Sequence, residues 1–191
     1  MPNYVTASEF DEYVVNEFGS VEASLRLAAL NAAERMVDEY CARSFAVASG
    51  SSARLYVPDG SDVVRIHDCT AVSAITLDGA SISSTTYQLE PTVQSWSGQT
   101  RPYEQVRYLL GAWVGAIPGK AAVSVTATWG WAAVPADVVE AVKIAGKDIL
   151  AQRRTVGNMA TVGDFGGTVR LNTYVRQLLA PLRRVEAFGL A

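Results

Sequence analysis

The sequence predicts an α+β protein, in which a small helical bundle built from N-terminal and C-terminal helices carries an inserted antiparallel β-rich region. Apolar residues recur at helical spacing near both ends of the chain. In the middle they alternate with polar residues, as in half-buried strands, and the connections are too short for crossover helices. We therefore assign residues 1–45 and 134–191 to the bundle and residues 46–133 to the β insert.

Near the N-terminus, Thr6 and Glu9 have the spacing of a capping box, which predicts a helix over residues 7–17 that stops at Gly19. Ser20 is expected to cap a second, longer helix. The apolar stripe expected on that helix comprises Leu25, Ala29, Ala32, Met36 and Tyr40.

The β insert is predicted from short β-branched and aromatic runs separated by turn residues. These runs cover residues 54–57, 63–66, 73–77, 87–89, 106–109 and 122–129. Pro58-Asp59-Gly60 and Asp78-Gly79 are both expected to form hairpin-like turns.

Helical structure is expected to return near Pro135, which suits the first turn of a helix. The predicted buried stripe is Val138, Val142, Ala145 and Ile149, and the helix is expected to end at Arg153-Arg154. Residues 155–168 are rich in glycine and poor in large apolar side chains, which predicts a flexible loop. A last helix is expected from about Leu171, with a kink or break at Pro181.

Composition excludes several classes of protein. The 191 residues are 49% hydrophobic and 18% charged, as in a folded soluble domain, and the net charge of −3 offers no general basic field for nucleic acid. The start of the chain does not have the pattern of a signal peptide, and no membrane helix is expected. Charge is nevertheless polarised, because residues 1–50 carry −5 and residues 137–191 carry +3. This polarity favours head-to-tail contacts between copies.

No constellation for catalysis, metal binding or a cofactor is visible in the sequence. His67 is the single histidine, and neither Cys41 nor Cys69 has the spacing of a zinc ligand or a catalytic partner. The triplet at residues 164–166 resembles that of kinases, but the other kinase motifs do not accompany it. Trp129 and Trp131 leave two alternatives open, an aromatic ligand platform or a buried hinge. We therefore expect no enzyme activity and no cofactor.

With its helices and β insert in the order described above, the chain resembles the head-tail connector family of tailed bacteriophages. Members of this family are also described as head-to-tail adaptor or head-completion proteins. The resemblance is carried by residues 4–6 (YVT), 32–45 (AAERMVDEYCARSF), 87–91 (YQLEP), 126–131 (TATWGW, followed by Val134-Pro135) and 175–184 (VRQLLAPLRR). It covers nearly the whole chain. It implies a helical bundle with a β insert, no catalysis, and a dodecameric ring beneath the portal that leaves a channel for DNA.

The partners implied by this resemblance are other copies of the chain, the portal protein, a downstream tail or head-closure protein, and genome DNA passing through without sequence-specific binding. No membrane partner is expected. The protein would lie in the virion neck and, during assembly, in the host cytoplasm. A sugar- or peptide-binding module that uses the β region and its tryptophans is the alternative.

Two segments are candidate contact sites. The C-terminal segment combines an apolar stripe with arginines, which is typical of interfaces, and it is expected to face the portal or a neighbouring subunit. Its residues are Arg170, Leu171, Val175, Arg176, Leu178, Leu179, Leu182, Arg183 and Arg184. The alternative is that this helix closes the protein's own core. A lumen or inter-subunit loop is expected at Gly163, Asp164, Phe165, Gly166 and Gly167.

Overall fold

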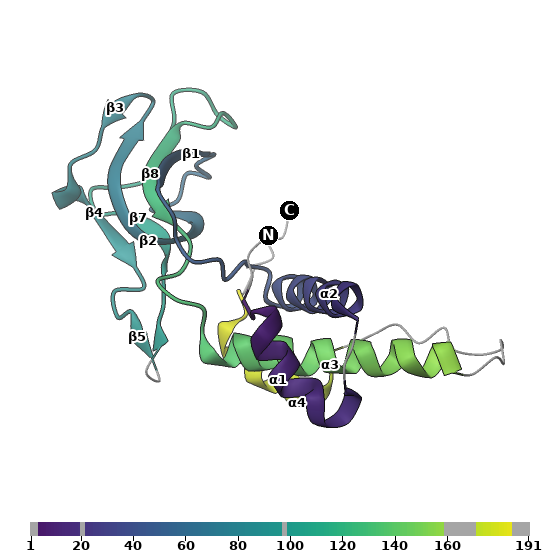
Figure 1. Ribbon diagram of the computed structural model, residues 1–191. Helices are drawn as coiled ribbons and strands as arrows, with labels where there is room; N and C mark the ends of the chain where they lie inside the picture. Colours follow the sequence, from purple (N-terminus) through teal and green to yellow (C-terminus); the bar gives the residue numbers. More distant parts are fainter. Residues whose placement is uncertain (1–3, 20–21, 97–98, 159–170, 185–191) are drawn as a thin grey trace. The chain divides into compact units, whose positions relative to one another are not determined.

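The computed structural model describes residues 4–19, 22–96, 99–158 and 171–184, and it confirms the α+β class (Figure 1). The chain divides into two compact units. Residues 1–45 and 134–191 form one, which we call the helical unit, and residues 46–133 form the other, the β unit.

The helical unit is built around one long helix. Its elements are α1 (Ala7–Phe18), α2 (Ala23–Cys41), α3 (Ala136–Asn158), α4 (Thr173–Leu179) and the short 3₁₀ helix η2 (Ala180–Leu182). Helices α1, α2 and α4 all contact α3. The capping box is confirmed, since the Thr6 side chain accepts from the amide of Glu9 and the Glu9 carboxylate accepts from the amide of Thr6. Gly146 allows close packing of α1 on α3, because a Cβ there would lie 3.0 Å from the Phe10 ring.

Helix α2 buries a different face from the one that its sequence predicts. The buried residues are Ala29, Leu30, Ala33, Glu34, Val37 and Cys41. Of the predicted stripe, Ala29 is fully buried, Ala32, Met36 and Tyr40 are half-buried, and Leu25 is 42% exposed, so the prediction is wrong at Leu25. The helix has small residues on adjoining faces, so spacing alone does not select the one that packs on α3. Its expected cap, Ser20, lies outside the described residues, and Glu22 makes no side-chain capping bond.

Helix α3 confirms its predicted stripe, since Val138, Val142, Ala145 and Ile149 are all buried. The helix continues to Asn158 and does not end at Arg153-Arg154. One glycine costs a helix only about 1 kcal/mol relative to alanine, so Gly157 by itself does not stop it. The first four residues of the predicted 155–168 loop are therefore helical, and the loop from residue 159 lies outside the described residues.

The β unit contains a six-stranded antiparallel sheet with the strand order β1-β8-β2-β7-β4, in which β3 pairs with β2. Its strands are β1 (Ser51–Tyr56), β2 (Val63–Leu77), β3 (Ala80–Ser81), β4 (Tyr87–Glu90), β7 (Tyr103–Tyr108) and β8 (Val123–Trp129). A 3₁₀ turn, η1 (Ser84–Thr86), precedes β4, while β5 (Ser95–Trp96) and β6 (Gln99–Thr100) form a separate two-stranded ribbon. Strand β8 alternates as expected, with Val123, Val125, Ala127 and Trp129 buried.

Two features of this sheet differ from the sequence prediction. The runs 63–66 and 73–77 are parts of the single strand β2, which absorbs the residues between them through irregularities in register. The turn at 78–79 does join paired strands, and Asp78 and Gly79 both have the positive φ of a tight hairpin turn. The turn at 58–60 does not, because β8 lies between β1 and β2. The residues of a turn do not specify which strand, distant in sequence, will pair beside β1 in the sheet.

Candidate interaction surface

The C-terminal segment contributes both to the core and to the surface of the helical unit. Val175, Leu179 and Leu182 are at most 3% exposed. Pro181 interrupts the helix as predicted, since α4 ends at Leu179 and η2 follows. For these three apolar residues, the alternative in which the segment closes the protein's own core is therefore favoured.

The other predicted contact residues lie nearer to solvent or outside the described part. Arg176 and Arg183 are exposed, while Leu171, Leu178 and Arg184 are half-buried. Arg170 and the five loop residues from Gly163 to Gly167 lie outside the described residues, so their expected roles stay predictions.

One tyrosine brings the two exposed arginines together. The guanidinium carbon of Arg176 lies 5.9 Å from the centroid of the Tyr40 ring, and that of Arg183 lies 5.3 Å from it. Both distances are within the range of cation–π attraction. We call these three residues the arginine–tyrosine surface. The sequence analysis placed Tyr40 in the apolar stripe of α2 and did not identify it as part of a contact surface, because no local signal links residue 40 to residues far along the chain.

Backbone hydrogen bonds hold this surface in place. The Tyr40 hydroxyl donates to the carbonyl of Arg176 at 3.3 Å, and the amide of Arg184 donates to the carbonyl of Cys41 at 2.8 Å. Arg43 also donates, at 3.4 Å, to the carbonyl of Leu182. The end of α2 and the segment after α4 are thus joined on both sides of the arginines, so a partner would meet arginines whose backbones are already fixed.

The arginines of this surface have no acidic partner within the described residues, where no ion pair joins Arg176 or Arg183 to a carboxylate. Two half-buried cations of the helical unit differ in this respect, since Lys147 donates to Glu17 and Arg26 to Asp11. The arginine–tyrosine surface therefore gathers two positive charges that no carboxylate of the described residues neutralises.

A second polar cluster of the helical unit lies beneath its surface and is occupied internally. Tyr4 donates its amide to Glu34 at 2.7 Å and its hydroxyl to Asp38 at 2.8 Å. The same hydroxyl accepts from the amide of Phe45 at 2.9 Å and lies 3.0 Å from Ser44 Oγ. Burial raises the pKa of the Asp38 carboxyl to about 6 and also raises the pKa of Glu34. These bonds tie the N-terminal segment to the end of α2, which gives the cluster a structural role.

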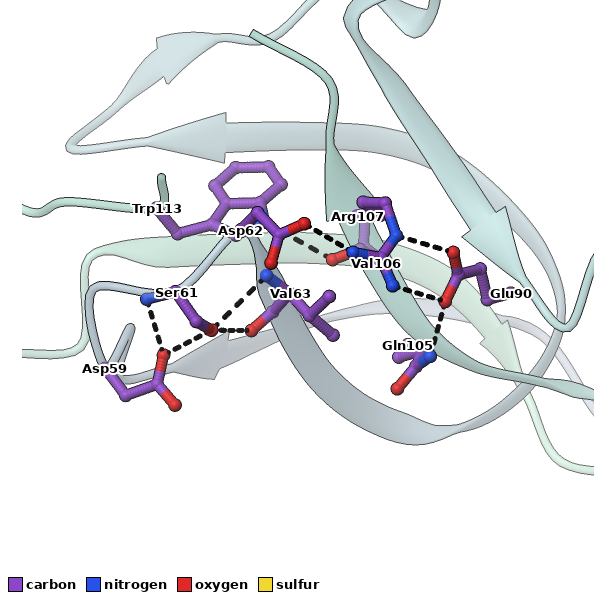
Figure 2. Close-up of polar contacts among 9 residues, drawn as sticks. All are labelled: Asp59, Ser61, Asp62, Val63, Glu90, Gln105, Val106, Arg107 and Trp113. Atoms are coloured by element: carbon purple, nitrogen blue, oxygen red, sulfur yellow. Dashed lines mark hydrogen bonds and ion pairs between the residues drawn. The ribbon is translucent and has the colours of Figure 1, made fainter. Parts of the chain in front are cut away.

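In the β unit, the polar groups around Arg107 also satisfy one another (Figure 2). Arg107 Nε donates to Glu90 at 2.7 Å, the same guanidinium pairs with Asp62, and Gln105 donates to Glu90. These hydrogen bonds lower the pKa of Glu90. Arg107 and Gln105 line a hollow of about 450 Å³, but with both side chains engaged they do not form a set of unpaired groups converging on a ligand.

The tryptophan pair is buried, which favours the second of the two alternatives raised by the sequence. Trp131 is fully buried and donates its indole N–H to Asp68 at 3.1 Å, and Trp129 is 9% exposed and donates to the carbonyl of Ser52 at 2.9 Å. Between them, Gly130 has φ +119°, and a Cβ there would lie 2.5 Å from the carbonyl oxygen of Ala46. Neither ring is available as a ligand platform.

The remaining reactive side chains are His67, Cys41 and Cys69. His67 lies on an exposed position of β2, where its Nδ1 is 2.8 Å from the Tyr56 hydroxyl. Burial raises the pKa of the Cys41 and Cys69 thiols to about 12 each. Within the described ranges, no group of three or more histidine, cysteine or acidic side chains is arranged to hold a metal ion, and no described helix has the length and hydrophobicity to cross a membrane.

No family model and no curated protein matches the sequence. Solved structures do match its fold. A chain from the neck of an empty gene transfer agent (GTA) particle, computed with C6 symmetry, aligns with a TM-score of 0.56 and 19% identity over 97% of this chain and 92% of that one. A chain from the virion of a native GTA particle aligns with a TM-score of 0.52, with the same identity and coverage. The fold implied by the sequence resemblance is thus confirmed, because the chain shares, over nearly its whole length, the fold of a GTA neck chain.

Proposed function

We propose that this chain is a structural virion protein that forms a ring-shaped head-to-tail adaptor beneath the portal and leaves a channel for DNA. The observation that carries this proposal is the likeness in fold to a chain of a GTA neck over 97% of the sequence, which includes both units. A neck is a structural part of the particle, so the protein would lie in the virion neck after assembly in the host cytoplasm.

A ring is supported by the symmetry of that neck and by the charge of this chain. The neck containing the similar chain was computed with C6 symmetry, which suits a ring whose copy number is a multiple of six, including the dodecamer implied by the sequence resemblance. Head-to-tail contacts close into rings when the rotation between copies allows it. A chain whose first fifty residues carry −5 and whose last part carries +3 has the polarity that such contacts use.

The portal, a downstream tail or head-closure protein, and DNA complete the proposed set of partners. The exposed part of the C-terminal segment, with Arg176 and Arg183, would face the portal or a neighbouring subunit, and the glycine-rich loop would lie at the lumen or at a seam between subunits. We propose no enzymatic step, because the polar clusters described above are engaged in contacts within the fold. The burial of Trp129 and Trp131 gives the alternative of a sugar- or peptide-binding module no support.

Purified particles provide the test. Quantitative mass spectrometry is expected to find the chain in a fixed ratio to the portal protein, and electron cryo-microscopy is expected to place it as a ring at the head-tail junction. A chain that is absent from purified particles, or that is present in variable, substoichiometric amounts, contradicts the proposal.

A further inference from the structure

We propose that the arginine–tyrosine surface (Tyr40, Arg176 and Arg183) binds carboxylates of a second copy of the chain, and that the occupant is the acidic edge formed by Glu12 and Glu22. This inference rests on the proposed ring and names the contact between its subunits.

The chemistry of the surface calls for an anion. Two guanidiniums lie within 6 Å of one tyrosine ring, both side chains are exposed, and neither pairs with a carboxylate within the described residues. Guanidinium groups bind carboxylates through two parallel hydrogen bonds, and an aromatic ring beside them favours a protein interface. The fixed backbone around Tyr40 reduces the entropy lost when a partner binds.

The chain itself carries the complementary charge. Glu12 on α1 and Glu22 at the start of α2 are both exposed. They belong to the same region of the helical unit, because Arg26, one turn after Glu22, pairs with Asp11, the neighbour of Glu12. The first fifty residues, with a charge of −5, supply carboxylates for this surface, whereas the net charge of −3 offers no general basic field to concentrate DNA near it.

The two charged surfaces lie at opposite ends of one helix. Glu22 directly precedes α2 and Tyr40 is next to its last residue. At 1.5 Å per residue, the 18 positions between them place the two surfaces about 27 Å apart. Surfaces so separated cannot neutralise each other within one copy, but they can do so between successive copies. The resulting contact is heterologous, which is the type that generates rings.

Charge reversal tests this contact in the full-length protein. One variant carries Arg176→Glu and Arg183→Glu, and a second carries Glu12→Lys and Glu22→Lys. Sedimentation velocity and native mass spectrometry at low salt are expected to show oligomers for the unaltered chain. Each variant alone should dissociate at least about tenfold more readily, because like charges then face each other. An equimolar mixture should recover the oligomers, since both contacts between alternating copies are again complementary.

Three controls make the result specific. Arg35→Glu with Lys120→Glu introduces the same charge change at exposed positions elsewhere and should leave self-association unchanged. Circular dichroism should show each variant folded. Binding of a short DNA duplex should be weak and equal for the unaltered chain and for the control variant.

Four outcomes overturn the inference. In the first, the unaltered chain stays monomeric at high concentration; in the second, the arginine variant self-associates as the unaltered chain does; in the third, the mixture does not recover the oligomers. In the fourth, the arginine variant loses DNA binding without losing self-association, which would identify phosphate as the occupant. None of these removes the chain from the particle. Failure of the proposed function is the separate result that purified particles do not contain it.

Discussion

The helical unit and the β unit use their charged residues in different ways. In the β unit, Arg107 is held between Glu90 and Asp62, and Asp68 receives the indole N–H of buried Trp131. In the helical unit, Arg176 and Arg183 have no acidic partner among the described residues.

In the helical unit, the buried Glu34 and the half-buried Asp38 are bonded to Tyr4 and to no lysine or arginine within the described ranges. Arg107 of the β unit is thus neutralised within its own fold, whereas the two exposed arginines of the helical unit meet no carboxylate among the described residues. This difference indicates that the exposed arginines of the helical unit should be tested for contacts with a partner, and that its carboxyl groups should be tested for an effect of pH on stability.

The largest effect is expected in the β unit, from Trp131→Ala. The side chain is fully buried and its indole N–H donates to Asp68, so its removal leaves a cavity and takes one hydrogen-bond donor from a buried carboxylate. We expect the free energy of unfolding to fall by about 4 kcal/mol. Tryptophan fluorescence reports this unit selectively, because all four tryptophans lie between residues 46 and 133: Trp96, Trp113, Trp129 and Trp131. A fall of less than about 1 kcal/mol would show that the site repacks.

A smaller effect is expected in the helical unit from Leu179→Ala, which separates the core role of α4 from its surface role. Leu179 is fully buried, so we expect a loss of about 3 kcal/mol in denaturant unfolding followed by ellipticity at 222 nm. The matched control, Arg176→Ala on the exposed side of the same helix, should change stability by less than about 0.5 kcal/mol. Equal effects of the two substitutions would mean that α4 does not close the core.

Because Val175, Leu179 and Leu182 are all buried in the helical unit, truncation after Arg170 should unfold that unit.

The smallest effect is a pH dependence that distinguishes the units. The pKa of Asp38 is raised to about 6 from an ordinary value of 3.8, so the folded state binds more protons than the unfolded state between these values. The helical unit should therefore become more stable as the pH falls from 7 to 5, by about 1 kcal/mol after allowance for the partial exposure of the carboxyl.

The β unit should not show this gain. Its acids Asp59 and Glu90 have lowered pKa values, so their contributions are lost only as the pH falls below about 4.5. Melting curves at a series of pH values, followed by ellipticity and by fluorescence, check both halves of this prediction. Asp38→Asn should flatten the dependence of the helical unit, and an unchanged slope in that variant would assign the effect to another group.

The sequence by itself determined the features that depend on residues close together in the chain. The Thr6–Glu9 capping box, the stripe from Val138 to Ile149 and the break at Pro181 are all confirmed, because each arises within one or a few helical turns. The hairpin turn at Asp78-Gly79 belongs with them, since its two residues adopt the conformation that the turn requires.

Tertiary structure decided what depends on distant partners. Strand β8 enters between β1 and β2, and α3 selects the face of α2 that carries Leu30 and Val37, although neighbouring faces are similarly apolar. The same packing places Tyr40, which is half-buried, beside Arg176 and Arg183. The physical reason is that local periodicity fixes the type of an element, whereas its partner is chosen by burial and hydrogen bonding over the whole chain.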